Sequence, residues 1–208
     1  MKRIFFSLAL LLAVTTLAAQ TNMTAREAAV KIADRILAST TYEFKNTKTG
    51  ETYKSVKKLP LDMNVKVACK YNNWHYTNGV TNMALMELGD KLADKKYEKY
   101  VLKNMNFVFN EGNLEFFRKQ YDEAFKQDGW NAVRKLSWHM IFRGKRLDDN
   151  GPMGASLIEL QLKYPNDSFL GYINETAEHL NYGEPRLVDG TIARIWPHVN
   201  TIWADDAF

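Results

Sequence analysis

The chain has 208 residues, of which 46% are apolar and 25% are charged, and its formal net charge is +4. This composition is typical of a globular protein and excludes the disordered, collagen-like and low-complexity classes. A single cysteine, Cys69, excludes a disulfide scaffold, a CxxC redox pair and a cysteine-based zinc site.

The chain begins with a segment typical of a secretory signal peptide. Two basic residues precede an apolar run over residues 4–19 that ends in small side chains, and we expect cleavage after Ala18 or Ala19. The run is shorter than the about 20 residues of a transmembrane helix, although a membrane anchor is the alternative. We therefore expect residues 20–208 to be a secreted or periplasmic domain without stable membrane association. Removal of the segment lowers the net charge to +2, which gives no indication of nucleic-acid binding.

Helical periodicity dominates the remaining sequence. Residues 24–37 form an amphipathic pattern, and Thr24 with Glu27 is typical of a capping box at its start. The polar residues 41–61 predict a loop, and the best strand signal is 187–193. Further helices are expected over 78–93, 95–109, 151–164 and 167–180, with an inserted segment over 113–147 that is partly helical around 114–127 and 130–141.

The two pairs of predicted helices form an internal repeat. A shift of 72 residues aligns residues 78–109 with 150–181 without a gap. The matches include Asn78-Gly79 with Asn150-Gly151, Leu85 with Leu157, Glu87-Leu88 with Glu159-Leu160, and Tyr97 with Phe169. A helical hairpin cannot bury an apolar face alone, so the copies should stack as an α-solenoid or close into a ring. Chance similarity between two amphipathic hairpins is the alternative.

The repeat predicts that both first helices begin at the same end of the assembly. Helix N-termini there favour an anionic ligand. Candidate side chains lie in the segments before these two starts and in a third segment, which leads to the helix expected near residue 205. The aromatic candidates are Trp74, Tyr76, Trp196 and Trp203, and the paired carboxylates are Asp148, Asp149, Asp205 and Asp206. His75, His198 and Arg194 are candidate contacts for a ligand carboxylate. Paired carboxylates suit general acid–base catalysis, and aromatic rings suit sugar stacking. The alternatives are helix capping for the aspartates and core packing for the tryptophans.

Other aromatic residues and motifs carry less functional information. Trp130, Trp138, Phe107 and Phe109 are expected to be structural. The sequence contains no HxH, HExxH, GxSxG, P-loop or GxGxxG pattern, so we expect neither a metal nor a nucleotide cofactor.

Four segments carry a resemblance to a known family. They are Trp74-His75-Tyr76-Thr77-Asn78-Gly79, Arg146-Leu147-Asp148-Asp149-Asn150-Gly151-Pro152-Met153-Gly154-Ala155, Asp189-Gly190-Thr191 and Thr201-Ile202-Trp203-Ala204-Asp205-Asp206. At these residues the sequence resembles the unsaturated glucuronyl and rhamnogalacturonyl hydrolases, glycoside hydrolase families 88 and 105. The resemblance runs from about residue 24 to the end and implies an all-α fold, an (α/α)6 barrel, of which this chain would supply roughly the first half.

The resemblance implies an exported enzyme with an unsaturated uronide oligosaccharide as substrate, most readily of the rhamnogalacturonan type. In this family an aspartic acid protonates C4 of the 4,5-unsaturated uronic acid, water adds at C5, and the hemiketal opens to release the neighbouring sugar, without a metal or cofactor. By motif match, Asp205 is the acid–base residue and Asp149 the second carboxylate, with Asp148 as its alternative in the substrate site.

The resemblance also implies the residues that line the sugar site. Trp203 and Tyr76 match positions that contact the sugar, with Trp74, Arg194 and His198 as further candidates for substrate binding. The alternatives are a non-catalytic helical-repeat module that binds carbohydrate or protein, and an inactive truncated fragment.

Overall fold

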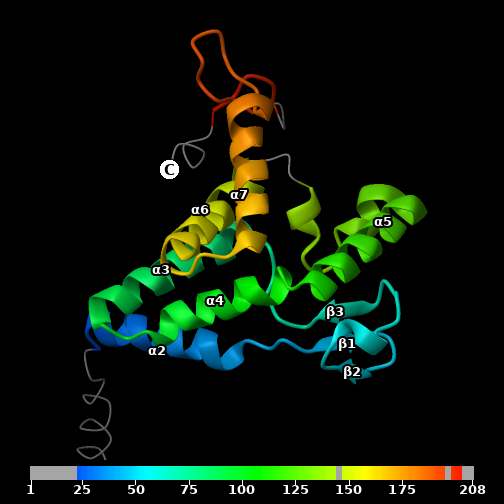
Figure 1. The fold of residues 1–208 in the computed structure, drawn as a ribbon, viewed down its shortest axis with the longest axis horizontal. Coiled ribbons are helices and arrows are strands. Elements are labelled where there is room, and N and C mark those ends of the chain that lie inside the picture. The colour runs from blue at the N-terminus through cyan, green and yellow to red at the C-terminus, as the bar shows by residue number, and fades with distance from the viewer. Residues whose placement is uncertain (1–22, 144–146, 195–197, 203–208) are drawn as a thin grey trace, which may run out of the picture. The chain divides into compact units, whose positions relative to one another are not determined.

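The computed structural model describes residues 23–143, 147–194 and 198–202. Its helices are α2 (Ala25–Ser39), α3 (Tyr76–Leu92), α4 (Lys96–Val108), α5 (Glu111–Val133), α6 (Leu147–Lys163) and α7 (Asp167–Glu178), and its strands are β1 (Phe44–Asn46), β2 (Thr52–Tyr53) and β3 (Val65–Val67) (Figure 1). Shorter turns are η1 (Val56–Lys58), η2 (His139–Phe142) and the π-helical η3 (His179–Gly183). The described residues are mostly helical, as the sequence predicts. None of their helices is both long and apolar enough to cross a membrane.

The chain divides into two compact units, residues 1–35 and 36–208, and α2 begins in the first of them. Its start is a capping box: the backbone N–H of Thr24 donates to Glu27 Oε2 (2.8 Å), and the backbone N–H of Glu27 donates to Thr24 Oγ1 (3.2 Å). These bonds satisfy two donors that a helix start leaves without an intrahelical partner. The predicted cap is confirmed, and the helix ends two residues beyond the predicted Leu37.

The second unit contains the two helical hairpins that the repeat predicts, α3–α4 and α6–α7. Helices α3 and α6 pack together more extensively than any other pair of elements. Gly79, near the start of α3, lies against the backbone of Pro152 and Met153 near the start of α6. Lys163 Nζ, at the end of α6, lies 2.9 Å from Oδ2 of Asp90 near the end of α3. The two helices therefore run parallel and side by side (Figure 1).

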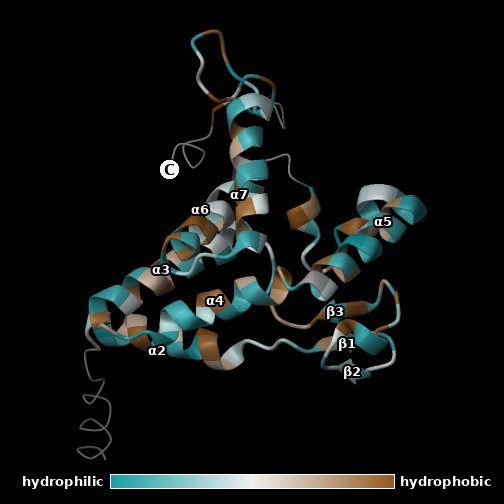
Figure 2. Ribbon diagram, viewed as in Figure 1, coloured by the Kyte–Doolittle hydropathy of each residue, from teal (hydrophilic) through white to brown (hydrophobic). Residues whose placement is uncertain are grey.

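Matched positions of the repeat occupy matched places in the core. Leu85 of α3 and Leu157 of α6 are both buried, as are Tyr97 of α4 and Phe169 of α7. Figure 2 shows that these helices carry both apolar and polar residues along their length, as expected for helices that are buried on one side. The 72-residue repeat is thus a repeat of structure as well as of sequence.

A buried carboxylate joins the two hairpins at their far end. Glu98 of α4 accepts hydrogen bonds from Lys163 Nζ (2.9 Å) and from the hydroxyl of Tyr164, and its side chain is 2% exposed. These bonds, Lys163 first, lower the pKa of Glu98 to about 2. The charge is paired and hydrogen-bonded, which is the condition under which a buried carboxylate is tolerated.

The segment predicted to be a loop, 41–61, contains two of three short strands. The strands are antiparallel in the order β2–β1–β3, and Phe44 pairs with Tyr53 on one side and Val67 on the other. Phe44 is buried among the rings of Phe107, Phe116 and Phe117. The prediction is wrong because strands of two or three residues are too short to show an alternating pattern.

The predicted strand at 187–193 is also wrong. These residues form a turn closed by an isolated bridge between Arg186 and Ile192, with Gly190 at a φ of 88°. The backbone N–H of Gly190 donates to the carbonyl of Leu187 (2.9 Å). A left-handed glycine is typical of such a turn, so the Asp-Gly pair outweighs the flanking apolar residues.

The inserted segment is helical in two stretches, as predicted around 114–127 and 130–141. Helix α5 covers 111–133 with non-helical dihedral angles at Asp128 and Gly129, which fall between the two predicted stretches and mark a kink. The second stretch ends at Val133, and turns and the short η2 replace the rest of the predicted helix. Trp138 and Phe109 are buried, as expected for structural residues. Trp130 is 38% exposed and lies under the guanidinium of Arg143.

Candidate functional site

The candidate site is the end of the second unit at which α3 and α6 begin. Both helices begin earlier than predicted: α3 starts two residues before the predicted Asn78, and α6 starts four residues before the predicted Gly151. The predicted common end is confirmed because the helices are parallel, but the Asn-Gly pairs lie within the first turns and both asparagines face inward. Asn78 and Asn150 are both buried.

The two repeated asparagines hold neighbouring segments in place. Asn78 Nδ2 donates to the carbonyls of Lys70 and Asn73 (both 2.9 Å), which fixes the loop before α3. Asn150 Oδ1 accepts a hydrogen bond from the hydroxyl of Tyr172 on α7 (2.9 Å). The repeated Asn therefore has a structural role in each copy.

The aromatic residues before α3 divide between core and surface. Trp74 has no exposed surface and packs against Phe109, Trp138 and Tyr172. The prediction that Trp74 contacts sugar is therefore wrong, because a ring buried among aromatic neighbours cannot stack on a ligand.

Tyr76 is 48% exposed, and its ring lies 4.7 Å from that of His75. His75 caps α3, since its Nδ1 accepts from the backbone N–H of Thr77. This orientation leaves the two exposed rings together at the helix start. They form an accessible aromatic surface at the candidate site.

An ion pair ties the start of α6 to a segment far along the chain. Arg194 Nη2 lies 2.5 Å from Oδ1 of Asp148, and the two side chains are only 13% and 30% exposed. Arg194 also forms a bridge with Thr201, in which its backbone N–H donates to the carbonyl of Thr201 (2.8 Å). The segment that leads towards residue 203 is therefore anchored beside the first turn of α6. His198 lies exposed between the two ends of this bridge.

Several predicted site residues fall outside the described part of the chain. Trp196, Trp203, Asp205 and Asp206 lie outside it entirely, as do residues 1–22 with the predicted cleavage point. Asp149 belongs to the first turn of α6, but its side chain lies outside the described part. Of the described candidates, the structure brings together Asp148 with Arg194 and His75 with Tyr76.

The Asp-Gly-Thr motif after α7 forms a turn. Asp189 Oδ1 accepts a hydrogen bond from the backbone N–H of Thr191 (2.9 Å), and this bond lowers the pKa of the Asp189 carboxyl. Arg186 donates to the carbonyls of Leu180 and Gly190 across the same turn. The motif thus shapes the path of the chain towards Arg194.

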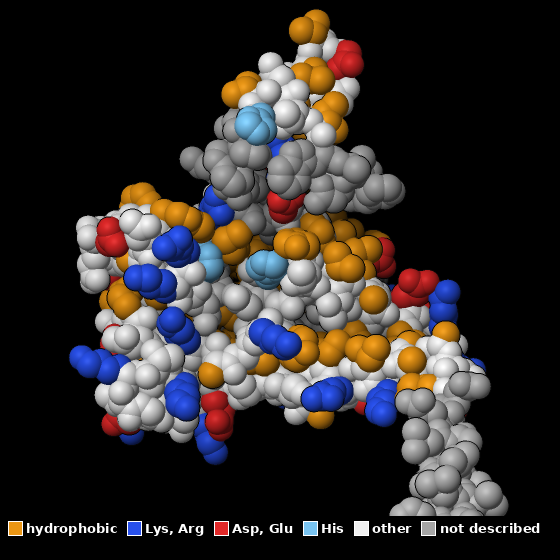
Figure 3. Space-filling model, turned by 180° about the vertical axis from the view of Figure 1, so that it is seen from behind, with side chains coloured by type: hydrophobic (Ala, Val, Ile, Leu, Met, Phe, Trp, Pro, Cys, Tyr) orange, Lys and Arg blue, Asp and Glu red, His pale blue; other side chains and the backbone are white. Residues whose placement is uncertain are grey.

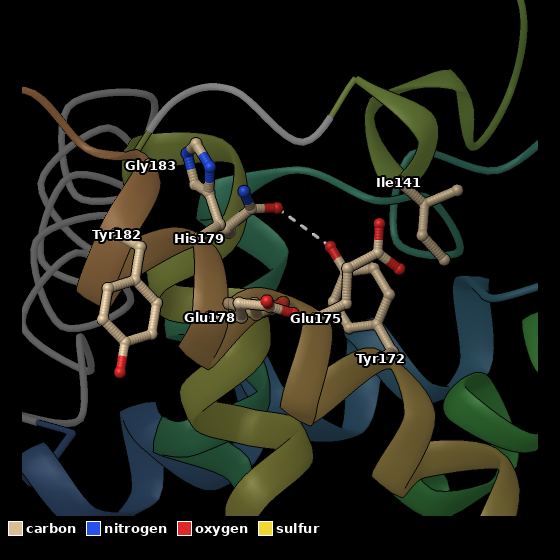
Figure 4. A pocket seen from close by; sticks show the side chains of 9 residues that line it. Ile141, Tyr172, Glu175, Glu178, His179, Tyr182 and Gly183 are labelled. Atoms are coloured by element: carbon tan, nitrogen blue, oxygen red, sulfur yellow. Dashed lines mark hydrogen bonds between the residues drawn. The ribbon is translucent and has the colours of Figure 1, made fainter.

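A pocket of about 390 Å³ opens between α6, α7 and the turns around them. Its lining contains Asn150 and Tyr172, which are joined by their hydrogen bond, together with Ile141, Glu175, Thr176, Glu178, His179, Tyr182 and Gly183 (Figure 4). His179 Nε2 lies 3.0 Å from Oε1 of Glu184, whose side chain is 7% exposed. The lining thus combines hydroxyl, amide and carboxylate groups, which are suited to hydrogen bonds with a polar ligand.

Sequence reasoning missed this pocket. Glu175, Glu178 and His179 stand at helical spacing in the sequence, so their shared face could have indicated a polar cluster. In the part of the chain that the structure describes, no group of three His, Cys, Asp or Glu side chains is placed to hold a metal ion. Neither a protein-family model nor a curated protein matches this chain.

Proposed function

We propose that the chain belongs to an exported hydrolase of oligosaccharides that carry a 4,5-unsaturated uronic acid at the non-reducing end, most readily those derived from rhamnogalacturonan. The observation that carries the proposal is the ion pair between Asp148 and Arg194. It joins the first turn of α6, which contains Asp149, to the segment that precedes Trp203 and Asp205. The described segment before Trp203 is thereby anchored at the end of the second unit at which α6 begins, which supports a site at that end.

The pairing also favours one assignment of the double aspartate. Asp148 is engaged with Arg194, so its charge is neutralised and its oxygen is occupied. We therefore assign the second site carboxylate to Asp149 and give Asp148 and Arg194 a positioning role. Arg194 is correspondingly less suited to bind the substrate carboxylate than the sequence suggests.

In the proposed reaction, Asp205 in its acid form donates a proton to C4 of the unsaturated ring. The same carboxylate then takes a proton from the water that adds at C5. The product is a hemiketal, which opens by breaking its C5–O5 bond to give a ketone at C5 and a hemiacetal at C1. The hemiacetal then collapses to an aldehyde and releases the neighbouring sugar as an alcohol. This sequence consumes one water and requires no oxidant, metal or cofactor, and the exposed ring of Tyr76 would lie against the sugar.

The proposed (α/α)6 toroid is supported by an exposed copy of the α3 packing face. Shifting Gly79 and Met86, both buried, by one repeat gives Gly151 and Ile158. Apart from its chain neighbours, a Cβ at Gly151 would have nothing within 4 Å, and Ile158 is 46% exposed. The face of α6 that corresponds to the face of α3 packed on α6 is therefore exposed. A further helical hairpin could pack on it in the way that α6 packs on α3.

The test is turnover of a rhamnogalacturonan lyase digest by the full chain. Consumption of the substrate removes the ultraviolet absorbance of its conjugated double bond. We expect Asp205→Asn and Asp149→Asn to abolish this loss of absorbance, while the control Asp167→Asn, which changes an acid in the first turn of α7, leaves it intact. A wild-type chain that leaves the absorbance unchanged, or an Asp205→Asn variant that matches wild type, contradicts the proposal.

Calorimetry on the same oligosaccharides separates the alternatives. Binding without turnover, retained in Asp205→Asn, indicates a carbohydrate-binding module. The absence of both binding and turnover indicates an inactive fragment. The exposed His75–Tyr76 ring pair is the feature that favours binding as the second candidate.

A further inference from the structure

The outward face of the β2–β1–β3 sheet carries a group of lysines. Side chains alternate between the two faces of a strand, and Phe44, Val65 and Val67 are buried. Lys45 and Lys66, which lie between these positions, therefore point to the opposite face. They are also register partners across β1 and β3, so the two ammonium groups project from neighbouring points on the sheet.

Lys54 extends this group at the end of β2. It lies in the bend that directly follows Tyr53, the last residue of β2. Lys45 and Lys54 are exposed, and Lys66 is half-buried. In the described part of the chain, Lys45, Lys54 and Lys66 form no ion pair with an Asp or Glu side chain. Two exposed acids flank the strands, Glu43 before β1 and Glu51 before β2, and they offer two negative charges against these three positive ones. We call Lys45, Lys54 and Lys66 the lysine face.

The lysine face is electrostatically suited to a negative ligand. Like charges directly opposite each other destabilise a sheet, so the face gains stability when negative charge lies over it. Further exposed lysines border it in the turn and in η1, namely Lys48, Lys57 and Lys58. Figure 3 shows Lys and Arg side chains spread over the side of the molecule formed by the sheet and α5, with fewer Asp and Glu among them.

We propose that the lysine face binds a linear acidic polysaccharide through its repeated carboxylates. The outward strand positions are Lys45, Thr52 and Lys66, which provide point charges and a hydroxyl. They include no aromatic ring on which a nucleic-acid base would stack, and no apolar side chain that would enter a lipid surface. Charge complementarity with a polyuronate is what this set of side chains provides. The surface goes beyond the proposed hydrolysis, because it would hold the polymer and not the cleaved linkage.

The experiment measures binding of the full chain to immobilised polygalacturonate. The variant Lys45→Gln/Lys54→Gln/Lys66→Gln removes the lysine face and leaves the side-chain lengths similar. We expect its affinity at low salt to fall by roughly tenfold. Wild-type binding should weaken as salt is added, because exposed charges are screened.

The matched control removes the same amount of charge elsewhere. Lys91, Lys99 and Lys119 are exposed and lie on α3, α4 and α5, so Lys91→Gln/Lys99→Gln/Lys119→Gln makes the same change in net charge. It also removes the exposed ion pairs of Lys91 with Glu87 and of Lys119 with Glu115, which are worth little to stability. We expect the control to change the affinity by less than about twofold. Equal losses in the two triple variants, or no loss in the lysine-face variant, would overturn the proposal.

Competing polyanions complete the test. Binding to polyglutamate, single-stranded DNA or anionic vesicles that is tighter than binding to polygalacturonate, at equal charge concentration, would overturn the choice of partner. Circular dichroism checks that each variant is folded. Turnover of short unsaturated oligosaccharides is measured in parallel and should be unchanged in the lysine-face variant, so a failure of the proposed hydrolysis is distinguished from a failure of this binding surface.

Discussion

The contact between α3 and α6 gives the sharpest prediction, which compares the same substitution at two matched positions of the repeat. A Cβ at Gly79 would collide with backbone atoms of Pro152 and Met153, whereas a Cβ at Gly151 would have nothing within 4 Å apart from its chain neighbours. We expect Gly79→Ala to destabilise the protein. Gly151→Ala should leave stability nearly unchanged, because the higher helix propensity of alanine is offset by crowding of its Cβ against the ring of the following Pro152. A large difference between the two variants therefore reports the packing of α3 on α6.

The magnitude follows from two opposing contributions. Alanine in a helix is favoured over glycine by about 0.5–1 kcal/mol. Overpacking costs about 1–3 kcal/mol, and the colliding atoms of Pro152 and Met153 belong to the backbone, so they cannot rotate away as a side chain would. We expect Gly79→Ala to lower the free energy of unfolding by about 2 kcal/mol. Gly151→Ala should change it by less than about 0.5 kcal/mol, because the position precedes Pro152.

Urea unfolding followed by circular dichroism measures both values on the full chain. The thermal midpoint should fall by about 4–8 °C for Gly79→Ala and change by less than about 2 °C for Gly151→Ala, since 1 kcal/mol corresponds to about 2–4 °C at this size. Gly79→Ala as stable as wild type would refute the close packing of α3 on α6. An equal loss at Gly151 would refute the open face of α6.

Three further substitutions test the buried contacts. The pKa of Glu98 is lowered to about 2, so the free energy of unfolding of the wild type should fall by on the order of 2–3 kcal/mol as the pH falls from about 5 to 2. Glu98→Gln should remove most of this pH dependence. Urea unfolding across the same pH range measures it. Trp74→Ala should cost about 3–5 kcal/mol, and a thermal midpoint within 2 °C or so of wild type would contradict its place in the core. Asp148→Asn should lower the free energy of unfolding by about 1–2 kcal/mol and speed hydrogen exchange of the Arg194 backbone amide. Unchanged exchange would contradict the anchoring of that segment.

The helices are predictable because their signals are local. The capping box at Thr24 and Glu27 needs only a few consecutive residues of sequence, and both of its hydrogen bonds form. The repeat is recognisable because packing faces recur at helical spacing, so Leu85 and Leu157 can be matched from the order of the residues alone. The predicted starts of α3 and α6 lie two to four residues too late. Asparagine followed by glycine is typical of a turn, whereas in this protein Asn78 and Asn150 lie inside the helices and their side-chain amides bind neighbouring segments.

The sequence by itself determined that the chain is mainly helical, that two helical hairpins repeat, and that aromatic and carboxylate side chains lie near the helix starts. Only the tertiary structure decided which of those residues remain accessible. Trp74 and Tyr76 are two positions apart, yet one is completely buried and the other is half exposed. Asp148 and Arg194 are 46 residues apart and meet because α6, α7 and the following turn return the chain to the same end. Periodicity is a property of neighbouring residues, whereas burial and ion pairing depend on segments that only folding brings together.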